Sequence, residues 1–214
     1  MWNTLYLIKE FFVKLYRYPV QTLRREGVDY DSYWGEKRAK GLGVLSRWPK
    51  QRADMALQRM DKDADLTVID IGCGDGAVLA YLKKNARVTR AIGVDVSEVA
   101  LKKAEANGIE TIRSEADPLK SLPLSLKADY VLMFEGLEHM VNSEEQLRAM
   151  IDISERGVFF SFPNTGYIHH RLRLLFGAFP LQWQLHPGEH VRFWTYRDLV
   201  WWLKALEISE YTIQ

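Results

Sequence analysis

Short apolar, β-branched runs alternate with helical stretches from residue 66 onward, and this alternation constrains the fold more than any other feature. The strand candidates are residues 66–71, 91–96, 110–113, 130–134 and 157–162, and the helix candidates between them are residues 77–84, 98–107 and 144–154. Antiparallel neighbours can be joined by tight turns, whereas parallel neighbours need crossovers, so this order indicates parallel pairing. We therefore expect an α/β body with a doubly wound, mainly parallel, Rossmann-like sheet, whose ligands bind beyond the carboxyl ends of the strands.

The composition excludes several classes of protein. The chain has 214 residues, which favours one domain with an N-terminal appendage. With 29 Lys and Arg against 28 Asp and Glu, the net charge of +1 excludes a globally basic nucleic-acid binder. The single cysteine, Cys73, excludes an internal disulfide framework and a zinc site of clustered thiolates. A cytoplasmic enzyme fits these bounds.

Residues 1–60 are interpreted as a helical extension that precedes a domain at residues 61–214. An apolar stripe at helical spacing, which Pro19 ends, consists of Leu5, Ile8, Phe12 and Leu15. Further helices are expected near residues 30–40 and 49–60. No apolar run is long enough to span a membrane, and no signal-peptide cleavage site follows the first helix.

The amphipathic N-terminal helix has two interpretations, and both stay open. Its stripe can pack on the domain or on a protein partner. Alternatively, residues 1–25 anchor the chain at an anionic lipid surface, because residues 1–55 carry a local charge of +5, from 11 basic and 6 acidic residues. Lipid anchoring would place the protein peripherally at the inner face of the membrane.

A glycine-rich turn follows the first strand and precedes a helix, in the order Val68-Ile69-Asp70-Ile71-Gly72-Cys73-Gly74-Asp75-Gly76. Glycines here permit positive φ and let a ligand approach the backbone. Asp70, just before the turn, can accept hydrogen bonds from a polar or cationic ligand. Asp95, at the end of the next strand, stands where an acid grips ribose hydroxyls or caps the following helix with Ser97.

This turn resembles motif I of the class I S-adenosylmethionine-dependent methyltransferases. The other matches to that family are Asp95 in its second acidic motif, Asp117 as the acid beside the adenine, and residues 128–132 as its fourth strand. The resemblance covers residues 64–162 and implies the class I methyltransferase fold with S-adenosylmethionine as cofactor, Asp70 facing the methionine ammonium. The residues then expected to bind the cofactor are Asp70, Gly72, Cys73, Gly74, Gly76, Asp95, Val96, Asp117, Phe134 and Glu135. A Rossmann dehydrogenase is disfavoured because its third glycine has G-x-x-G spacing, whereas the last two glycines here are two apart.

Two carboxylates and an imidazole follow the fourth strand in Phe134-Glu135-Gly136-Leu137-Glu138-His139. If this stretch is helical, residues 135, 138 and 139 stand at i, i+3 and i+4 and project to one side. Three interpretations stay open. These side chains support the cofactor and the packing, or His139 is a general base, or all three residues hold a divalent cation that acidifies a bound hydroxyl.

The pattern Glu-x-x-Glu-His resembles the metal-binding motif of ubiquinone-type O-methyltransferases and of the methyltransferases that modify the 2′-hydroxyl at small-RNA ends. The latter take a later histidine from a stretch similar to His190-Val191-Arg192-Phe193-Trp194-Thr195. Accordingly, His139, Glu138 and His190 are the expected catalytic residues. Glu-His also occurs here in members without a metal, so we favour no metal and keep a divalent cation as the alternative. An RNA substrate is disfavoured because no basic stripe accompanies the motif.

The connection at residues 163–194 is long enough to be functional and is interpreted as a cap over the acceptor. Its middle is expected to form a short amphipathic helix with Arg171 and Arg173. The aromatic side chains expected at the cofactor mouth are Tyr167, Trp183 and Phe193, and those expected in a lid are Tyr30, Tyr33 and Trp34. The histidines expected at the surface are His169 and His170, and those left open between pocket and structural roles are His186 and His190.

Residues 161–195 also resemble the MetW-like branch of the superfamily, part of which is associated with homoserine O-acetyltransferase. A helix is expected at residues 196–206, and the residues after it resemble a sixth strand. Two functions are compatible with these resemblances. The first is methyl transfer to an oxygen of a small-molecule or of a lipid- or glycan-linked acceptor. The alternative is a non-catalytic or regulatory subunit that binds a biosynthetic enzyme such as homoserine O-acetyltransferase.

Overall fold

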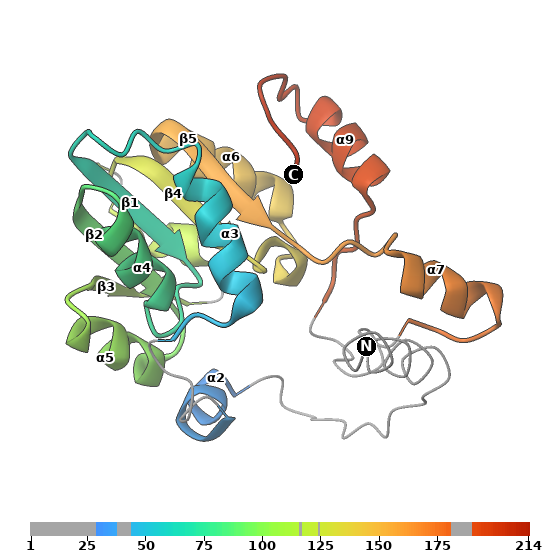
Figure 1. Cartoon of the computed structure of the whole chain (residues 1–214), viewed down its shortest axis with the longest axis horizontal. Coiled ribbons are helices and arrows are strands. Elements are labelled where there is room, and N and C mark those ends of the chain that lie inside the picture. Colours follow the sequence, from blue (N-terminus) through green and yellow to red (C-terminus); the bar gives the residue numbers. More distant parts are fainter. Residues whose placement is uncertain (1–28, 38–43, 116, 124, 181–189) are drawn as a thin grey trace, which may run out of the picture. The chain divides into compact units, whose positions relative to one another are not determined.

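The computed structural model describes residues 29–37, 44–115, 117–123, 125–180 and 190–214 (Figure 1). The chain divides into two compact units, one at Val28–Phe162 and another that contains the residues from Pro163 onward. The amphipathic helix expected near residues 5–18 lies outside the described residues, as do Trp183 and His186. None of the described helices is long and apolar enough to cross a bilayer.

A five-stranded parallel sheet in the order β3-β2-β1-β4-β5 forms the centre of the first unit. Its strands are β1 (Leu66–Ile71), β2 (Val88–Asp95), β3 (Glu110–Arg113), β4 (Ala128–Phe134) and β5 (Ser154–Ser161). This architecture confirms the doubly wound α/β sheet expected from the sequence. The starts of β2 and β5 were predicted three residues too late, because exposed polar residues, Thr89 and Arg90 in β2 and Glu155 and Arg156 in β5, interrupt the apolar pattern near the start of each strand.

Helices cover both faces of the sheet, with α3 and α4 on one face and α6 on the other (Figure 1). The helices of the first unit are α2 (Tyr30–Ser32), which continues as a π-helical turn at Tyr33–Lys37, α3 (Arg47–Leu57), α4 (Ala77–Asn85), α5 (Glu98–Ala106) and α6 (Ser143–Ile153). Short 3₁₀ turns occupy Pro118–Ser121 and Leu137–His139. Pro49 stands in the first turn of α3, where its missing N–H costs no helical hydrogen bond.

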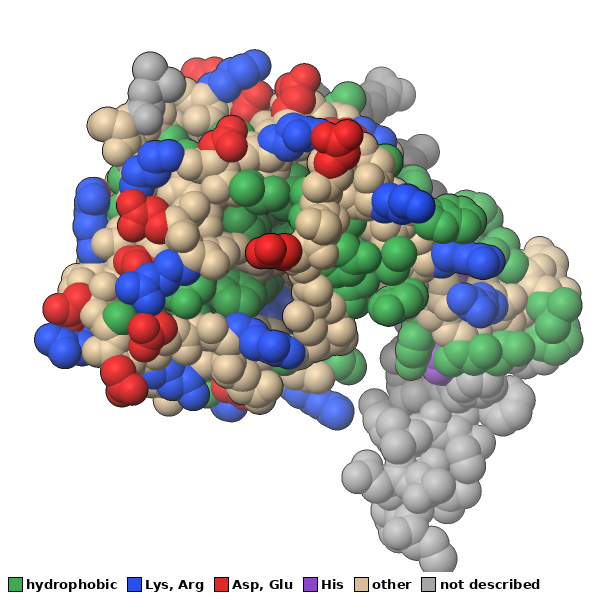
Figure 2. All heavy atoms as spheres, turned by 90° about the horizontal axis from the view of Figure 1, so that it is seen from above, with side chains coloured by type: hydrophobic (Ala, Val, Ile, Leu, Met, Phe, Trp, Pro, Cys, Tyr) green, Lys and Arg blue, Asp and Glu red, His purple; other side chains and the backbone are tan. Residues whose placement is uncertain are grey.

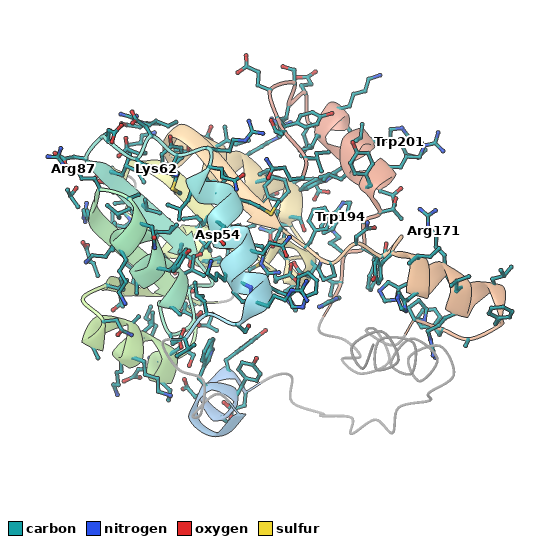
Figure 3. The ribbon with its side chains drawn as sticks, in the orientation of Figure 1. Asp54, Lys62, Arg87, Arg171, Trp194 and Trp201 are labelled. Atoms are coloured by element: carbon teal, nitrogen blue, oxygen red, sulfur yellow. The ribbon has the colours of Figure 1, made fainter. Side chains whose placement is uncertain are left out.

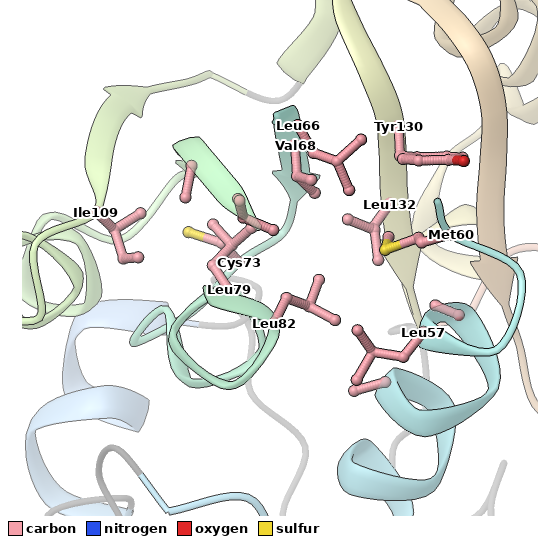
Figure 4. Close-up of a cluster of buried hydrophobic side chains, with 14 of the residues drawn as sticks. Leu57, Met60, Leu66, Val68, Cys73, Leu79, Leu82, Ile109, Tyr130 and Leu132 are labelled. Atoms are coloured by element: carbon pink, nitrogen blue, oxygen red, sulfur yellow. The ribbon is translucent and has the colours of Figure 1, made fainter. Parts of the chain in front are cut away.

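The core lies between α3, α4 and the sheet (Figure 4). Its side chains from α3 and the residues just after it are Ala53, Ala56, Leu57 and Met60. They pack with Leu79 and Leu82 of α4 and with Tyr130 and Leu132 of β4. Helix α3, which the sequence assigned to the N-terminal extension, therefore shares one core with the sheet. This packing fixes the first residues of α3 beside the carboxyl ends of the strands.

The second unit contains α7 (Ile168–Leu175) and α9 (Tyr196–Ala205). A backbone bridge joins Asn164 to Trp194, whose ring packs on Trp202 of α9 with centroids 5.0 Å apart (Figure 3). Thr195 and Asp198 cap the start of α9 reciprocally, which the structure shows as a complete capping box. The sixth strand expected after this helix is wrong: residues 209–214 form no regular structure and are mostly exposed, so they bury no apolar face as a strand would.

Candidate functional site

The turn between β1 and α4 brings the backbone close to an open space at the carboxyl end of the sheet. Gly72, Gly74 and Gly76 have φ of 77°, 54° and 72°, values that L side chains adopt only with strain. The N–H groups of Gly72 and Cys73 both donate to the carbonyl of Val94 on β2, at 2.7 and 3.1 Å. These two bonds attach the turn to the neighbouring strand and fix its path.

Asp95, the last residue of β2, connects this turn to the start of α5. Its Oδ2 accepts the Gly74 N–H at 2.8 Å and its Oδ1 accepts the Ser97 N–H at 2.9 Å. Burial raises the pKa of Asp95, and these hydrogen bonds oppose the rise. The capping role is thus taken by the backbone contacts of Asp95 and by the Ser97 hydroxyl, which accepts the Ala100 N–H at 3.1 Å.

Asp70 lies at the end of β1 and is 3% exposed. Within the described part of the chain, no donor forms a hydrogen bond with its carboxylate. Burial, with a smaller contribution from the charge of Asp95, raises the pKa of Asp70 to about 8. A buried carboxylate without a donor is unfavourable unless a ligand supplies a hydrogen bond or a positive charge, so Asp70 is suited to a cationic group.

A cavity of about 310 Å³ opens at this position. Its lining includes six residues that the sequence assigned to the cofactor: Asp70, Gly72, Cys73, Gly74, Phe134 and Glu135. A Cβ on Gly72 would meet nothing within 4 Å, which leaves that side of the turn open to a ligand. An elongated polar cofactor with a cationic amino-acid end fits this lining, because a bare backbone and an unpartnered carboxylate meet at one wall.

Tyr33 and Trp34, two of the three aromatic residues expected in a lid, line the cavity, whereas Tyr30 is outside its lining. Asp31, in the same segment, accepts hydrogen bonds from the Ser97 hydroxyl at 2.6 Å and from the Val99 N–H at 3.1 Å. These bonds lower the pKa of Asp31. Lys103 of α5 donates to the carbonyl of Trp34 at 2.9 Å. The segment at residues 29–37, where the lid is expected, is therefore attached to the start and the body of α5.

Arg52, on α3, lines the cavity and is the residue that the sequence interpretation missed. Its Nη1 lies 3.4 Å from Oε1 of Glu135, and its Nε is buried and has no hydrogen-bond partner in the described part of the chain. The only sequence signal is that Arg52 adjoins the buried positions Ala53 and Ala56 of an amphipathic helix. That signal is weak, because an arginine at the border of a buried face usually covers apolar surface with its stem.

The cluster after β4 is built differently from the helical arrangement expected. Glu135 has φ of 55° and is not helical, and only Leu137–His139 form a 3₁₀ turn. The expected helix is wrong because of a tertiary contact: the Glu135 N–H donates to the carbonyl of Ser161 on β5, which keeps the chain beside the sheet for one more residue. Glu135 Oε1 also accepts the Ser161 hydroxyl at 3.0 Å.

Glu138 is 1% exposed, and both of its carboxylate oxygens are buried and have no hydrogen-bond partner among the residues that the structure describes. Burial, and then the charge of Glu135, raises the pKa of Glu138 to about 8. His139 Nε2 lies 3.9 Å from Glu138 Oε1. An imidazole and a buried carboxyl group therefore stand side by side just beyond the carboxyl end of β4.

Four residues assigned to the cofactor lie outside the cavity lining, namely Gly76, Asp95, Val96 and Asp117. A Cβ on Gly76 would come within 2.9 Å of the Ala104 Cβ, so this glycine serves helix packing. Asp117 accepts hydrogen bonds from Gln146 at 2.7 Å and Asn142 at 3.4 Å on the α6 side. Burial raises the pKa of Asp117, but these bonds and Lys120 together hold it below its usual value.

The remaining candidates belong to the second unit. His190 has its ring 6.5 Å from that of Phe193, between centroids. The surface position expected for His169 and His170 is wrong, since both are half-buried and His169 stacks on Tyr167 with centroids 5.0 Å apart. Arg171 is exposed on α7, whereas Arg173 of the same helix is buried.

The fold and the glycine-turn site together define a class I S-adenosylmethionine-dependent methyltransferase. A family model described as a methyltransferase domain matches residues 43–207, and the chain belongs to this methyltransferase-domain family. No curated protein matches the sequence. The family membership makes the protein an enzyme of this class, with S-adenosylmethionine as its cofactor.

Solved structures resemble the chain at low identity. A protein of Haloferax volcanii, in complex with the Trm112 methyltransferase activator, shares 19% identity with a TM-score of 0.62, over 86% of this chain and 77% of that one. A SAM-dependent methyltransferase of Thermotoga maritima shares 16%, with a TM-score of 0.52, over 83% and 74%. The magnesium protoporphyrin IX methyltransferase of Synechocystis, with bound SAH, shares 16%, with a TM-score of 0.56, over 83% and 87%.

Proposed function

We propose that this methyltransferase methylates an oxygen of a small-molecule or of a lipid- or glycan-linked acceptor, with His139 and Glu138 as the groups that handle the proton. The observation that carries the proposal is the buried, unpartnered Glu138 carboxyl 3.9 Å from the His139 imidazole. A hydroxyl must lose its proton as it is methylated, and a positioned imidazole is the usual base for that step near neutral pH.

The lining of the cavity supports an assignment of each polar group of the cofactor to a particular residue. Asp70 would hold the methionine ammonium and Arg52 its carboxylate, because both line one cavity and Arg52 has a buried N–H without a partner among the described residues. Asp95 would accept hydrogen bonds from the ribose hydroxyls, in addition to those it accepts from the backbone. When bound, S-adenosylmethionine supplies an electrophilic methyl group. The protein then only has to align an acceptor and remove its proton.

Glu138 acts on the proton through His139. While its carboxyl is ionised, its negative charge attracts the positive charge that His139 acquires when it takes up the proton. Because the pKa of Glu138 is raised to about 8, this assistance increases with pH across the neutral range. His190, in the second unit, stays a prediction as a further catalytic imidazole.

The decisive measurement traces transfer of a labelled methyl group into a whole-cell extract by mass spectrometry, which identifies the acceptor and the methylated atom. We expect His139→Gln to lower kcat about 100-fold, the usual contribution of a general base, and to leave S-adenosylhomocysteine affinity unchanged. Asp70→Asn, in contrast, should weaken S-adenosylhomocysteine binding. A His139→Gln enzyme with full turnover, or an acceptor methylated on nitrogen, would refute the proposal.

A metal-dependent version uses the same cluster and is the second candidate, because Glu138 has two free buried oxygens. Glu135 fits a cation poorly, since its Oε1 already binds the Ser161 hydroxyl and faces the Arg52 guanidinium at 3.4 Å. We therefore expect activity to survive chelation by EDTA. Loss of activity that Mg²⁺ or Mn²⁺ restores would favour the metal.

The regulatory alternative is a subunit that binds a biosynthetic enzyme, as the MetW-like resemblance suggests. One solved neighbour, the Haloferax volcanii protein, is in complex with an activator. Copurification separates the alternatives: a partner at fixed stoichiometry, with no methyl transfer to any extractable acceptor, would favour the subunit. Docking of residues 1–25 on a partner or at the inner face of the membrane stays a prediction, which deletion of that segment tests.

A further inference from the structure

The segment around α7 exposes large apolar side chains. We call them the α7 patch: Tyr167, Ile168, Leu174, Leu175, Phe176 and Phe179. Leu175 is 76% exposed and Phe176 61%, and the other members are 52–53% exposed. Single exposed apolar residues are ordinary, but several within thirteen residues indicate a surface that meets a partner or a membrane.

The end of α7 is folded so that it holds the patch outward. Gly177, with φ of 74°, ends the helix, and its N–H donates to the carbonyl of Leu174 at 3.0 Å. The Ala178 N–H donates to the carbonyl of Arg173 at 2.7 Å. The buried Arg173 in turn donates from Nε to the carbonyl of Phe179 at 2.8 Å. The apolar side chains therefore extend from an ordered turn, which lowers the entropy cost of docking.

The segment around α7 carries basic residues but no acidic ones. No Asp or Glu occurs between Glu155 and Glu189, whereas Arg171 is exposed on α7 (Figure 3). Figure 2 shows hydrophobic side chains with Lys or Arg among them, and no Asp or Glu, at the right of the view. Leucine, isoleucine and aromatic side chains beside an arginine, without acids, match an anionic bilayer surface, where apolar groups enter the headgroup boundary and cations meet phosphates.

We propose that the α7 patch docks on an anionic lipid bilayer, with Leu175 and Phe176 entering the interface and Arg171 facing the lipid phosphates. A protein interface would instead call for a polar rim with acceptors as well as donors for hydrogen bonds. The docking does not depend on residues 1–25 or on the identity of the methyl acceptor, so it stands or falls separately from the proposed function.

Vesicle sedimentation tests the proposal with the full-length chain. We expect sedimentation with phosphatidylcholine vesicles that contain phosphatidylserine, and little with phosphatidylcholine alone. Phe176→Glu should weaken binding about tenfold, because one large apolar side chain is removed from the interface. The matched control is Trp48→Glu on α3, which has the same charge change at a position 63% exposed. Circular dichroism of both variants verifies that they are folded.

A fluorescent label locates the contact. The chain's single native cysteine, Cys73, is buried, so Leu175→Cys can be labelled selectively with an environment-sensitive dye. Anionic vesicles should shift its emission to the blue and leave the same label at Trp48→Cys unchanged. Three results would overturn the proposal: a wild-type chain that never sediments, Phe176→Glu binding as the wild type does, or a Leu175 label that shifts only when protein fractions are added.

Discussion

The carboxylate of Asp95, the last residue of β2, accepts the backbone N–H of Gly74 at 2.8 Å. The end of β2 therefore fixes the glycine turn that follows the neighbouring strand, β1. The same side chain accepts the N–H of Ser97 at 2.9 Å. Asp95 therefore fixes the shape of the glycine turn, in addition to the ribose contact that we propose for it.

Asp95→Ala should destabilise the protein by about 1–3 kcal/mol, because it leaves the buried Gly74 N–H without an acceptor. Urea unfolding measures this loss. Asp65→Ala is the control, since its ion pair with Arg87 is solvent-exposed and should contribute less than about 1 kcal/mol. Equal losses in the two variants would show that the Asp95–Gly74 bond is unimportant.

Gly74→Ala should weaken S-adenosylhomocysteine binding by displacing the lid. A Cβ at this position would overlap the Trp34 ring, and φ of 54° adds strain. Trp34→Ala removes the overlap, so the effects of the two substitutions on affinity should be non-additive by about 0.5–3 kcal/mol in a double-mutant cycle. Calorimetric titration of the four proteins gives this coupling, and strict additivity would contradict the contact.

Lys103→Ala should loosen the lid, because the Lys103 ammonium donates to the carbonyl of Trp34 at 2.9 Å. We expect faster proteolysis of the segment at residues 29–37 and S-adenosylhomocysteine binding a few-fold weaker. Lys102→Ala is the matched control, since that neighbour pairs with the exposed Glu98 rather than with the lid. If Lys102→Ala has the same effects, the lid is not held through Lys103.

Glu138→Gln should gain stability relative to the wild type as pH rises. The folded-state pKa of Glu138 is raised to about 8, so the folded protein retains a proton that the unfolded chain loses above about pH 4. The stability associated with that proton is complete at low pH and is lost as pH rises through about 8. Urea unfolding at about pH 5 and about pH 9 should show the difference, and a constant difference would place the carboxyl in a solvated environment.

The sequence predicted the sheet well because strand and helix periods differ and the glycines at residues 72, 74 and 76 mark the turn after β1. The bounds of β1 were evident from its apolar run, and β3 was also predicted with its exact bounds. Exposed polar residues near the starts of β2 and β5 concealed the beginnings of those two strands. Asp70 and the glycines were predictable because their chemistry depends on a short local motif.

The position of Arg52 in the cavity could not be predicted in this way, because it depends on α3 packing beside the carboxyl end of β1 in the folded protein. The geometry after β4 was also hidden. The Glu135 N–H bonds to Ser161, and this long-range contact decided against the helix that the i, i+3, i+4 spacing favoured. Residues that act through tertiary contacts leave little trace in a single sequence.

The position of β1 in the order β3-β2-β1-β4-β5 has an evolutionary consequence. The glycine turn and Asp95 come from β1 and β2, while Glu138 and His139 come after β4. Descendants of one ancestor can thus keep the half that carries the glycine turn unchanged and vary the segments beyond β4 and β5. A single inherited scaffold can acquire new target molecules in this way without rebuilding its means of activating the methyl group.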